Sequence, residues 1–94
     1  MPKYTDEYSA TFEETAKDVI QGKKTKRMLK KDILFILEEP YFKAKKIKEY
    51  SDQNVLRKNV CAGNFRIFYS IDETSKKVSF LFVRKKDKKT SKDL

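Results

Sequence analysis

The sequence predicts an α+β domain in which an N-terminal strand and a helical hairpin pack on a three-stranded antiparallel meander. Three runs rich in Val, Ile, Phe and Tyr occupy residues 55–61, 65–72 and 77–84, a composition typical of strands. Two short turn signals, 62–64 and 73–75, separate these runs, so each strand should pair with the next. A chain of 94 residues suffices for one domain with a single modest core.

Local signals predict the first two elements. Residues 2–9 alternate in the manner of a short strand. Thr11 and Glu14 match a capping box, which predicts a helix that begins at Thr11 and stops near Gly22. One face of this helix is apolar and should pack on the sheet: Phe12, Ala16, Val19 and Ile20.

A second helix is expected from Thr25 to Glu38 or Glu39, because Pro40 disfavours helix at the residue before it. The connection Gly22–Lys24 is short, so the two helices should form an antiparallel hairpin. The apolar stripe of the second helix is wide, which favours packing against the meander: Met28, Leu29, Ile33, Leu34, Phe35, Ile36 and Leu37.

The middle run of the meander places one arginine opposite its apolar residues. Phe65, Ile67 and Tyr69 should turn to one face of the strand and Arg66 to the other. A simple structural role for Arg66 is a surface ion pair with Asp72 or with a carboxylate on a helix.

Composition bounds the function. The formal charge is +9, from 23 Lys and Arg against 14 Asp and Glu, and a small protein this basic usually meets a polyanion such as nucleic acid. A merely solvated basic surface is the alternative.

Cys61 is the single cysteine and the chain has no His. We therefore expect Cys61 to be a strand residue of a protein in a reducing cytosol rather than a nucleophile. No apolar run is long enough to span a membrane, which predicts a cytoplasmic protein.

A basic stretch with aromatic residues connects the second helix to the meander. Mixed lysines and aromatics can follow a phosphate backbone while stacking bases; alternatively the aromatics anchor the segment and the lysines are solvated. After Arg84 the chain is basic again, and we assign residues 1–88 to the domain and 89–94 to a mobile basic tail. The lysines expected to bind RNA are Lys43, Lys45, Lys46, Lys48, Lys86 and Lys88.

The stretch LRKNVCAGNFRIFY, residues 56–69, together with the order of elements resembles the RelE/ParE toxin superfamily. A basic strand, a turn with Gly63, the pair Phe65 and Arg66, and then Tyr69 stand at the spacings of that family. The resemblance implies a toxin of a type II toxin–antitoxin system. Its RelE branch consists of ribosome-dependent mRNA endoribonucleases that inhibit translation, each neutralised by a cognate antitoxin.

The resemblance also implies site residues. Arg66 would stabilise the transition state of attack by a ribose 2′-hydroxyl on the neighbouring phosphodiester, because a guanidinium holds two phosphate oxygens at once. Arg57 and either Arg84 or Lys85 match further basic positions. With no His, a lysine crowded by these arginines, Lys58 or Lys85, is a candidate base. No zinc, dinucleotide or P-loop motif is present, so neither metal nor cofactor is expected.

Departures from the family pattern leave two other functions open. Asn59 and Cys61 stand where relatives carry basic residues, and neither Tyr nor His follows Arg84. A ParE-like inhibitor of DNA gyrase would not need a cleavage site. A catalytically inactive basic module that binds RNA or an antitoxin is the third possibility. All three imply an acidic, amphipathic antitoxin segment as partner, and the first adds the ribosome and mRNA.

Overall fold

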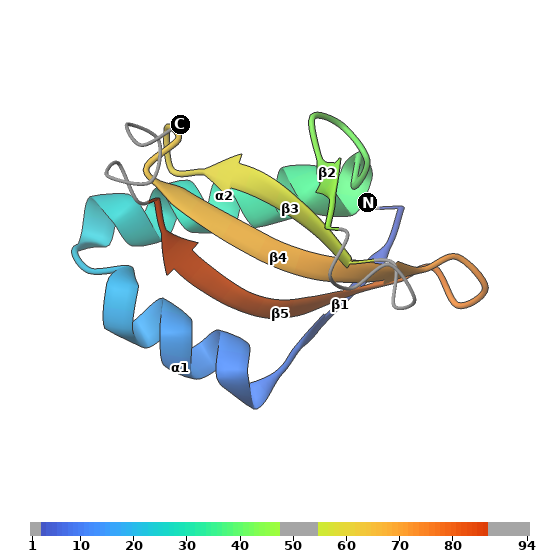
Figure 1. Cartoon of the computed structure of the whole chain (residues 1–94), viewed down its shortest axis with the longest axis horizontal. Helices are drawn as coiled ribbons and strands as arrows, with labels where there is room; N and C mark the ends of the chain where they lie inside the picture. Colours follow the sequence, from blue (N-terminus) through green and yellow to red (C-terminus); the bar gives the residue numbers. More distant parts are fainter. Residues whose placement is uncertain (1–2, 48–54, 87–94) are drawn as a thin grey trace.

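The computed structural model describes residues 3–47 and 55–86 and has a five-stranded sheet at its centre (Figure 1). The strands lie in the order β1-β5-β4-β3-β2. Strand β1 runs parallel to β5, and every other neighbouring pair is antiparallel. The strand bounds are β1 Thr5–Tyr8, β2 Lys45–Lys46, β3 Val55–Val60, β4 Phe65–Asp72 and β5 Lys77–Lys85.

The predicted meander is confirmed, and β4 is the middle strand of both the meander and the sheet. The N-terminal strand is also confirmed, although all four of its residues are exposed at the sheet edge. Strand β2 was not predicted, because only two residues pair and both are lysines that β propensity disfavours. It pairs with β3 and forms the edge of the sheet opposite β1.

Helices α1 (Ala10–Val19) and α2 (Lys23–Glu38) cover one face of the sheet, and the core lies between the helices and that face. In Figure 1, α1 lies along β5 and α2 passes behind β3 and β4. Side chains of both helices join those of the sheet in one buried cluster, in which Ile36, Ile67, Tyr69, Val78 and Phe80 are fully buried. No helix in the described part of the chain is long and apolar enough to cross a membrane.

The start predicted for α1 is wrong by one or two residues. Ser9, not Thr11, is the N-cap, and its Oγ accepts from the Phe12 amide at 2.9 Å. Strand β5 fixes this position, because the Ser9 hydroxyl donates to Leu81 O at 2.7 Å and the Ser9 amide donates to Phe80 O at 3.1 Å. Gly22, with φ of 85°, does not end α1 but precedes α2 directly. The predicted hairpin is therefore present with a connection at residues 20–22.

A bulge in β5 decides which residues of that strand face the helices. Phe68 pairs with Phe82 and Tyr69 with Phe80, so Leu81 is the extra residue. The side chain of Thr15 on α1 accepts from the Val83 amide at 3.0 Å, which satisfies a backbone donor beside the bulge. Beyond it, Val83 returns to the core, while Phe82 and Arg84 lie on the other face.

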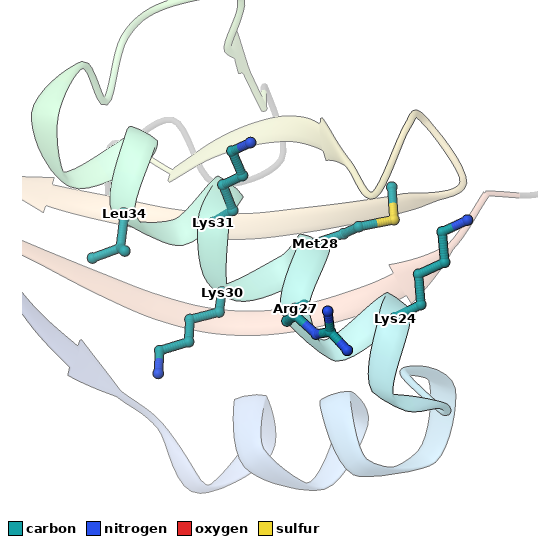
Figure 2. Close-up of a pocket in the computed structure, with 6 residues that line it drawn as sticks. All are labelled: Lys24, Arg27, Met28, Lys30, Lys31 and Leu34. Atoms are coloured by element: carbon teal, nitrogen blue, oxygen red, sulfur yellow. The ribbon is translucent and has the colours of Figure 1, made fainter.

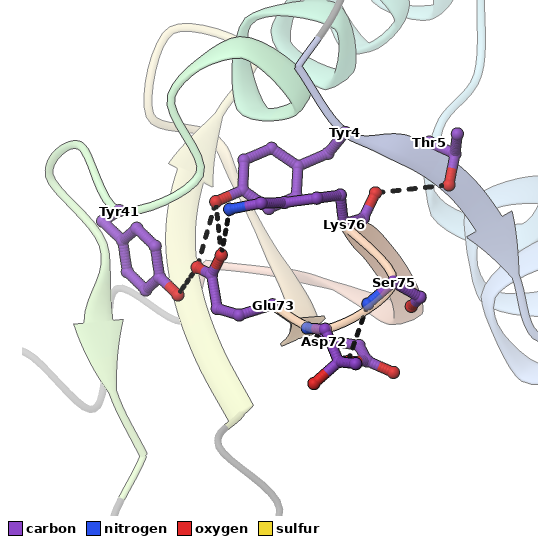
Figure 3. A network of polar contacts seen from close by, with 8 residues as sticks. Tyr4, Thr5, Tyr41, Asp72, Glu73, Ser75 and Lys76 are labelled. Carbon is purple, nitrogen blue, oxygen red and sulfur yellow. Dashed lines mark hydrogen bonds and ion pairs between the residues drawn. The ribbon is translucent and has the colours of Figure 1, made fainter.

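A polar cluster ties the N-terminal segment, the loop after α2 and the β4–β5 turn together (Figure 3). Glu73 accepts hydrogen bonds from the Tyr4 hydroxyl at 3.0 Å, from the Tyr41 hydroxyl, and from Lys76 Nζ at 2.9 Å. These donors, led by Lys76, lower the pKa of Glu73 to about 2. Asp72 caps the turn by accepting from the amides of Thr74 and Ser75.

Candidate functional site

The candidate site lies on the sheet face turned away from the helices, which we call the outer face. Alternation along the strands and the pairing register bring its residues together. Arg57 of β3 pairs with Phe68 of β4, and Arg66 of β4 lies between Asn59 of β3 and Arg84 of β5. The prediction that Arg66 faces away from Ile67 and Tyr69 is confirmed, since those two are fully buried among the helices.

A hollow of about 160 Å³ opens on the outer face. Its lining contains four cationic side chains and one amide, from β3, β4 and the segment around β2: Lys43, Lys45, Arg57, Asn59 and Arg66. Among residues 3–47 and 55–86, no ion pair joins any of these four cations to a carboxylate. The hollow therefore presents donors and positive charge to an anion.

Arg66 differs from the other cations of the hollow in having a buried donor without a partner within the described residues. Its Nε atom is buried and has no hydrogen-bond partner within the described residues. A buried polar atom without a partner costs free energy, typically about 1–3 kcal/mol. A phosphate oxygen in the hollow could satisfy this donor. The surface ion pair with Asp72 is not observed; that carboxylate accepts from its own turn.

Arg84 reaches the same face because of the bulge. Counting back from the turn pair Asp72–Lys77 without an extra residue would place Val83 opposite Arg66. With Leu81 inserted, Arg84 takes that position. Its guanidinium carbon lies 4.9 Å from the ring centre of Phe82 and 5.7 Å from that of Phe68. The last strand thus contributes one exposed cation held over an aromatic pair.

The structure does not place Lys58 with the arginines, so its predicted crowding by them is wrong. Lys58 follows Arg57 on β3 and turns to the opposite face, where its Nζ lies 4.2 Å from the ring centre of Phe35 on α2. Burial lowers the pKa of the Lys58 amine, with a contribution from Lys43, while Asp32 opposes the shift. Lys85 pairs with Phe65 rather than joining the row of Arg66 and Arg84.

The lysines predicted to bind RNA are divided by the fold. Lys43 and Lys45 line the hollow. Lys46 pairs with the core residue Leu56 and therefore turns from the outer face. Lys86 follows β5, where its amide donates to Asn64 O at 3.1 Å. Lys48, Lys88 and the predicted tail at 89–94 lie outside the described residues.

Cys61 is a buried residue, but it lies in the turn after β3, with φ of 54°, and the prediction of a strand residue is wrong. The residue is buried, its amide donates to Asp32 Oδ2 at 2.7 Å, and its thiol contacts Thr25 O at 3.8 Å. Burial, reinforced by Asp32, raises the pKa of the thiol, which disfavours the thiolate. Over the described residues no three His, Cys, Asp or Glu side chains gather as a metal site would require.

A second hollow, of about 460 Å³, lies along the exposed side of α2 (Figure 2). Figure 2 shows that every residue of its lining comes from this one helix. Four are cationic and two are apolar: Lys24, Arg27, Lys30, Lys31, Met28 and Leu34. The lysines here stand on solvated helix positions, and Leu34 is half exposed.

No family model and no curated protein matches this sequence. Solved structures do. The RelBE2 toxin–antitoxin complex of Mycobacterium tuberculosis contains a chain with a TM-score of 0.72 and 17% identity, over 92% of this chain and 100% of that one. The isolated RelE toxin of E. coli gives 0.70 and 17%, over 96% and 94%. The archaeal RelE–RelB complex of Pyrococcus horikoshii gives 0.69 and 13%, over 92% and 98%.

This chain has the RelE fold. The architecture that the resemblance of residues 56–69 implies is thereby confirmed. It is an antiparallel meander with two helices packed on one face of the sheet. Sequence reasoning missed one feature of the outer face. Phe68 and Phe82 were read as ordinary strand residues, yet their rings stack at 4.4 Å beside the arginines. A register that included the bulge would have found the pair.

Proposed function

We propose that the protein is the toxin of a toxin–antitoxin system and cleaves mRNA on the ribosome, thereby inhibiting translation. The observation that carries this proposal is the cluster of Arg57, Arg66 and Arg84 on the outer face, beside a hollow without carboxylate partners in the described residues. The RelE fold supports the proposal, because the solved proteins that share this fold are the RelE toxin of E. coli and a chain of the RelBE2 toxin–antitoxin complex.

The reaction that suits this cluster is an intramolecular transesterification, in which the 2′-oxygen of a ribose attacks the phosphodiester on its 3′ side. The 2′-oxygen attacks phosphorus, the 5′-oxygen leaves, and the products are a 2′,3′-cyclic phosphate and a 5′-hydroxyl. Negative charge grows on the non-bridging oxygens during this step, and fixed guanidinium donors stabilise it without reorganising. Arg66 has the donor available for that purpose, since its buried Nε has no partner within the described residues.

The proton of the 2′-hydroxyl needs an acceptor. Arginine is not deprotonated in proteins and an amide does not titrate, so Arg57, Arg66 and Asn59 cannot serve. Of the side chains that line the hollow, Lys43 and Lys45 are the ones that can exchange a proton. We assign to that lysine pair both transfers that the step requires, acceptance of the 2′-hydroxyl proton and donation of a proton to the leaving 5′-oxygen, in place of Lys58, which packs over Phe35.

A second function is favoured by the same displacement of Lys58. A site from which Lys58 is absent and in which fixed arginines predominate also suits a protein that binds an anion without cutting it. Such a protein would be a ParE-like inhibitor of DNA gyrase or an inactive basic module that binds RNA or an antitoxin. In each case an acidic, amphipathic antitoxin is the proposed partner, because a chain of net charge +9 gains from pairing with it.

Primer-extension mapping of a reporter mRNA in a translating extract tests the proposal. Wild-type protein should produce cuts that require translation, Arg66→Ala should abolish them, and the matched Arg27→Ala on α2 should retain them. Intact mRNA in the presence of folded wild-type protein would contradict the proposal. Loss of supercoiling by gyrase in a parallel assay would then favour the ParE-like function.

A further inference from the structure

We propose that Phe68, Phe82 and Arg84 form a stacking site for one unpaired base of the RNA. This inference rests on the proposed function and specifies the class of substrate: single-stranded RNA, held by a base as well as by its phosphates. The three residues are called the aromatic layer below.

The two rings of the aromatic layer are stacked, and the Arg84 guanidinium lies beside both of them. The rings of Phe68 and Phe82 lie 4.4 Å apart with 21° between their planes. The guanidinium carbon of Arg84 lies 4.9 Å from the centre of the Phe82 ring, and the side chain is exposed. Phe68 is buried outside the cluster that the helices cover, whereas Phe82 is only half-buried, so Phe82 is the ring that a base can reach.

The aromatic layer borders the hollow that we assign to phosphate. Arg84 pairs with Arg66 across β4 and β5, and Phe68 pairs with Arg57 across β3 and β4. Phe68 also follows Arg66 by two positions on the same face, a separation of roughly 7 Å along a strand. A nucleotide whose phosphate occupies the hollow would therefore have its base within reach of Phe82 and Arg84.

The chemistry of the aromatic layer suits a base better than it suits other ligands. Nucleobases stack on aromatic rings and on guanidinium planes. Arg84 can do this with its face while its edge donates to a phosphate oxygen. Bases inside a duplex are already stacked on one another, so only an unpaired nucleotide can enter such a site.

Fluorescence anisotropy with a 2′-O-methyl RNA of about ten nucleotides tests this inference, because the missing 2′-hydroxyl prevents cleavage during the measurement. Phe82→Leu keeps an apolar side chain but removes the ring, and we expect its dissociation constant to be about 5- to 150-fold larger. Phe35→Leu is the matched control, since Phe35 is also a partly exposed ring with a cation above it. Its affinity should equal that of the wild type.

A second measurement does not depend on how the variant folds. Wild-type protein should bind an RNA with an abasic site at the stacked position more weakly by the same factor, and inorganic polyphosphate should compete equally well against wild type and Phe82→Leu. Equal affinity of wild type and Phe82→Leu, or of single strand and duplex, would overturn the inference. Stacking without cleavage of natural mRNA would instead overturn the proposed function and leave the aromatic layer standing.

Discussion

The outer-face hollow and the hollow on α2 contain equal numbers of cations and differ in almost everything else. Each is lined by four Lys or Arg side chains. On the outer face these come from two strands and the segment around β2, and one of them, Arg66, has a buried donor. On α2 all four stand on the exposed side of one helix, beside Met28 and Leu34. Positive charge alone therefore does not distinguish a site; fixed donors converging from several elements do.

The largest expected difference between the hollows concerns the shape of the cation. Arg66→Lys keeps the charge but loses the planar fork, and we expect mRNA cleavage to fall roughly 10- to 100-fold. Arg27→Lys on α2 makes the same exchange where no geometry is imposed, and cleavage should stay at the wild-type rate. Initial rates of mRNA cleavage measure both. Equal losses in the two variants would reduce the site to a general electrostatic effect.

Lys58 sharpens the comparison from the opposite direction. It lies within one residue of Arg57 but packs over Phe35 on the helix side of the sheet. Lys58→Met should leave cleavage at the wild-type level, whereas Lys45→Met in the hollow should reduce it. The free energy of unfolding of Lys58→Met should change by less than about 1 kcal/mol, as expected for a half-exposed cation over a ring. Loss of cleavage in Lys58→Met would return Lys58 to the catalytic role first expected of it.

A smaller effect concerns the turn that joins Arg57 on β3 to Arg66 on β4. Cys61 and Ala62 have φ of 54° and 59°, and Gly63 has φ of 85°. Ala62→Gly should raise the free energy of unfolding by about 1 kcal/mol because it removes a left-handed alanine. Gly63→Ala should lower it by a similar amount, although nothing crowds the added methyl group. Urea denaturation measures both changes in the free energy of unfolding. Changes of opposite sign would support the left-handed conformation of these turn residues.

The smallest effect distinguishes stability from binding. The pKa of Glu73 falls from 4.5 to about 2 through its hydrogen bonds to Lys76 and the two tyrosines. Its stabilisation is therefore present above pH 4.5 and is lost as the pH falls toward 2. The melting temperature of wild type should drop more steeply over that window than that of Glu73→Gln. At pH 7 the two proteins should bind RNA equally, because Glu73 lies outside both hollows.

The sequence predicted the meander well and the helix ends less well. Alternation over residues 65–72 placed Arg66 opposite Ile67 and Tyr69 because a strand has a fixed period of two. The same rule separates Lys58 from Arg57, since consecutive residues of a strand face opposite sides. Crowding of Lys58 by the arginines was therefore inconsistent with the predicted strand.

The bulge could not be predicted from local pattern. Its extra residue, Leu81, is stabilised by contacts with distant residues: Ser9 donates to Leu81 O and Thr15 accepts from the Val83 amide. A capping box at Thr11 was the better local match, yet the tie to β5 moved the cap to Ser9. Arg84 and Phe82 join the site only through this long-range register.

The most direct test of the central claim is an NMR titration of ¹⁵N-labelled protein with the uncleavable 2′-O-methyl RNA. We predict that shifts concentrate on the amides of Arg57, Arg66 and Arg84, and that the Arg66 Nε–H signal moves as its buried donor gains a phosphate oxygen. Shifts centred on Lys24, Arg27 and Lys30 instead would place the RNA on α2 and contradict the assignment of the outer face.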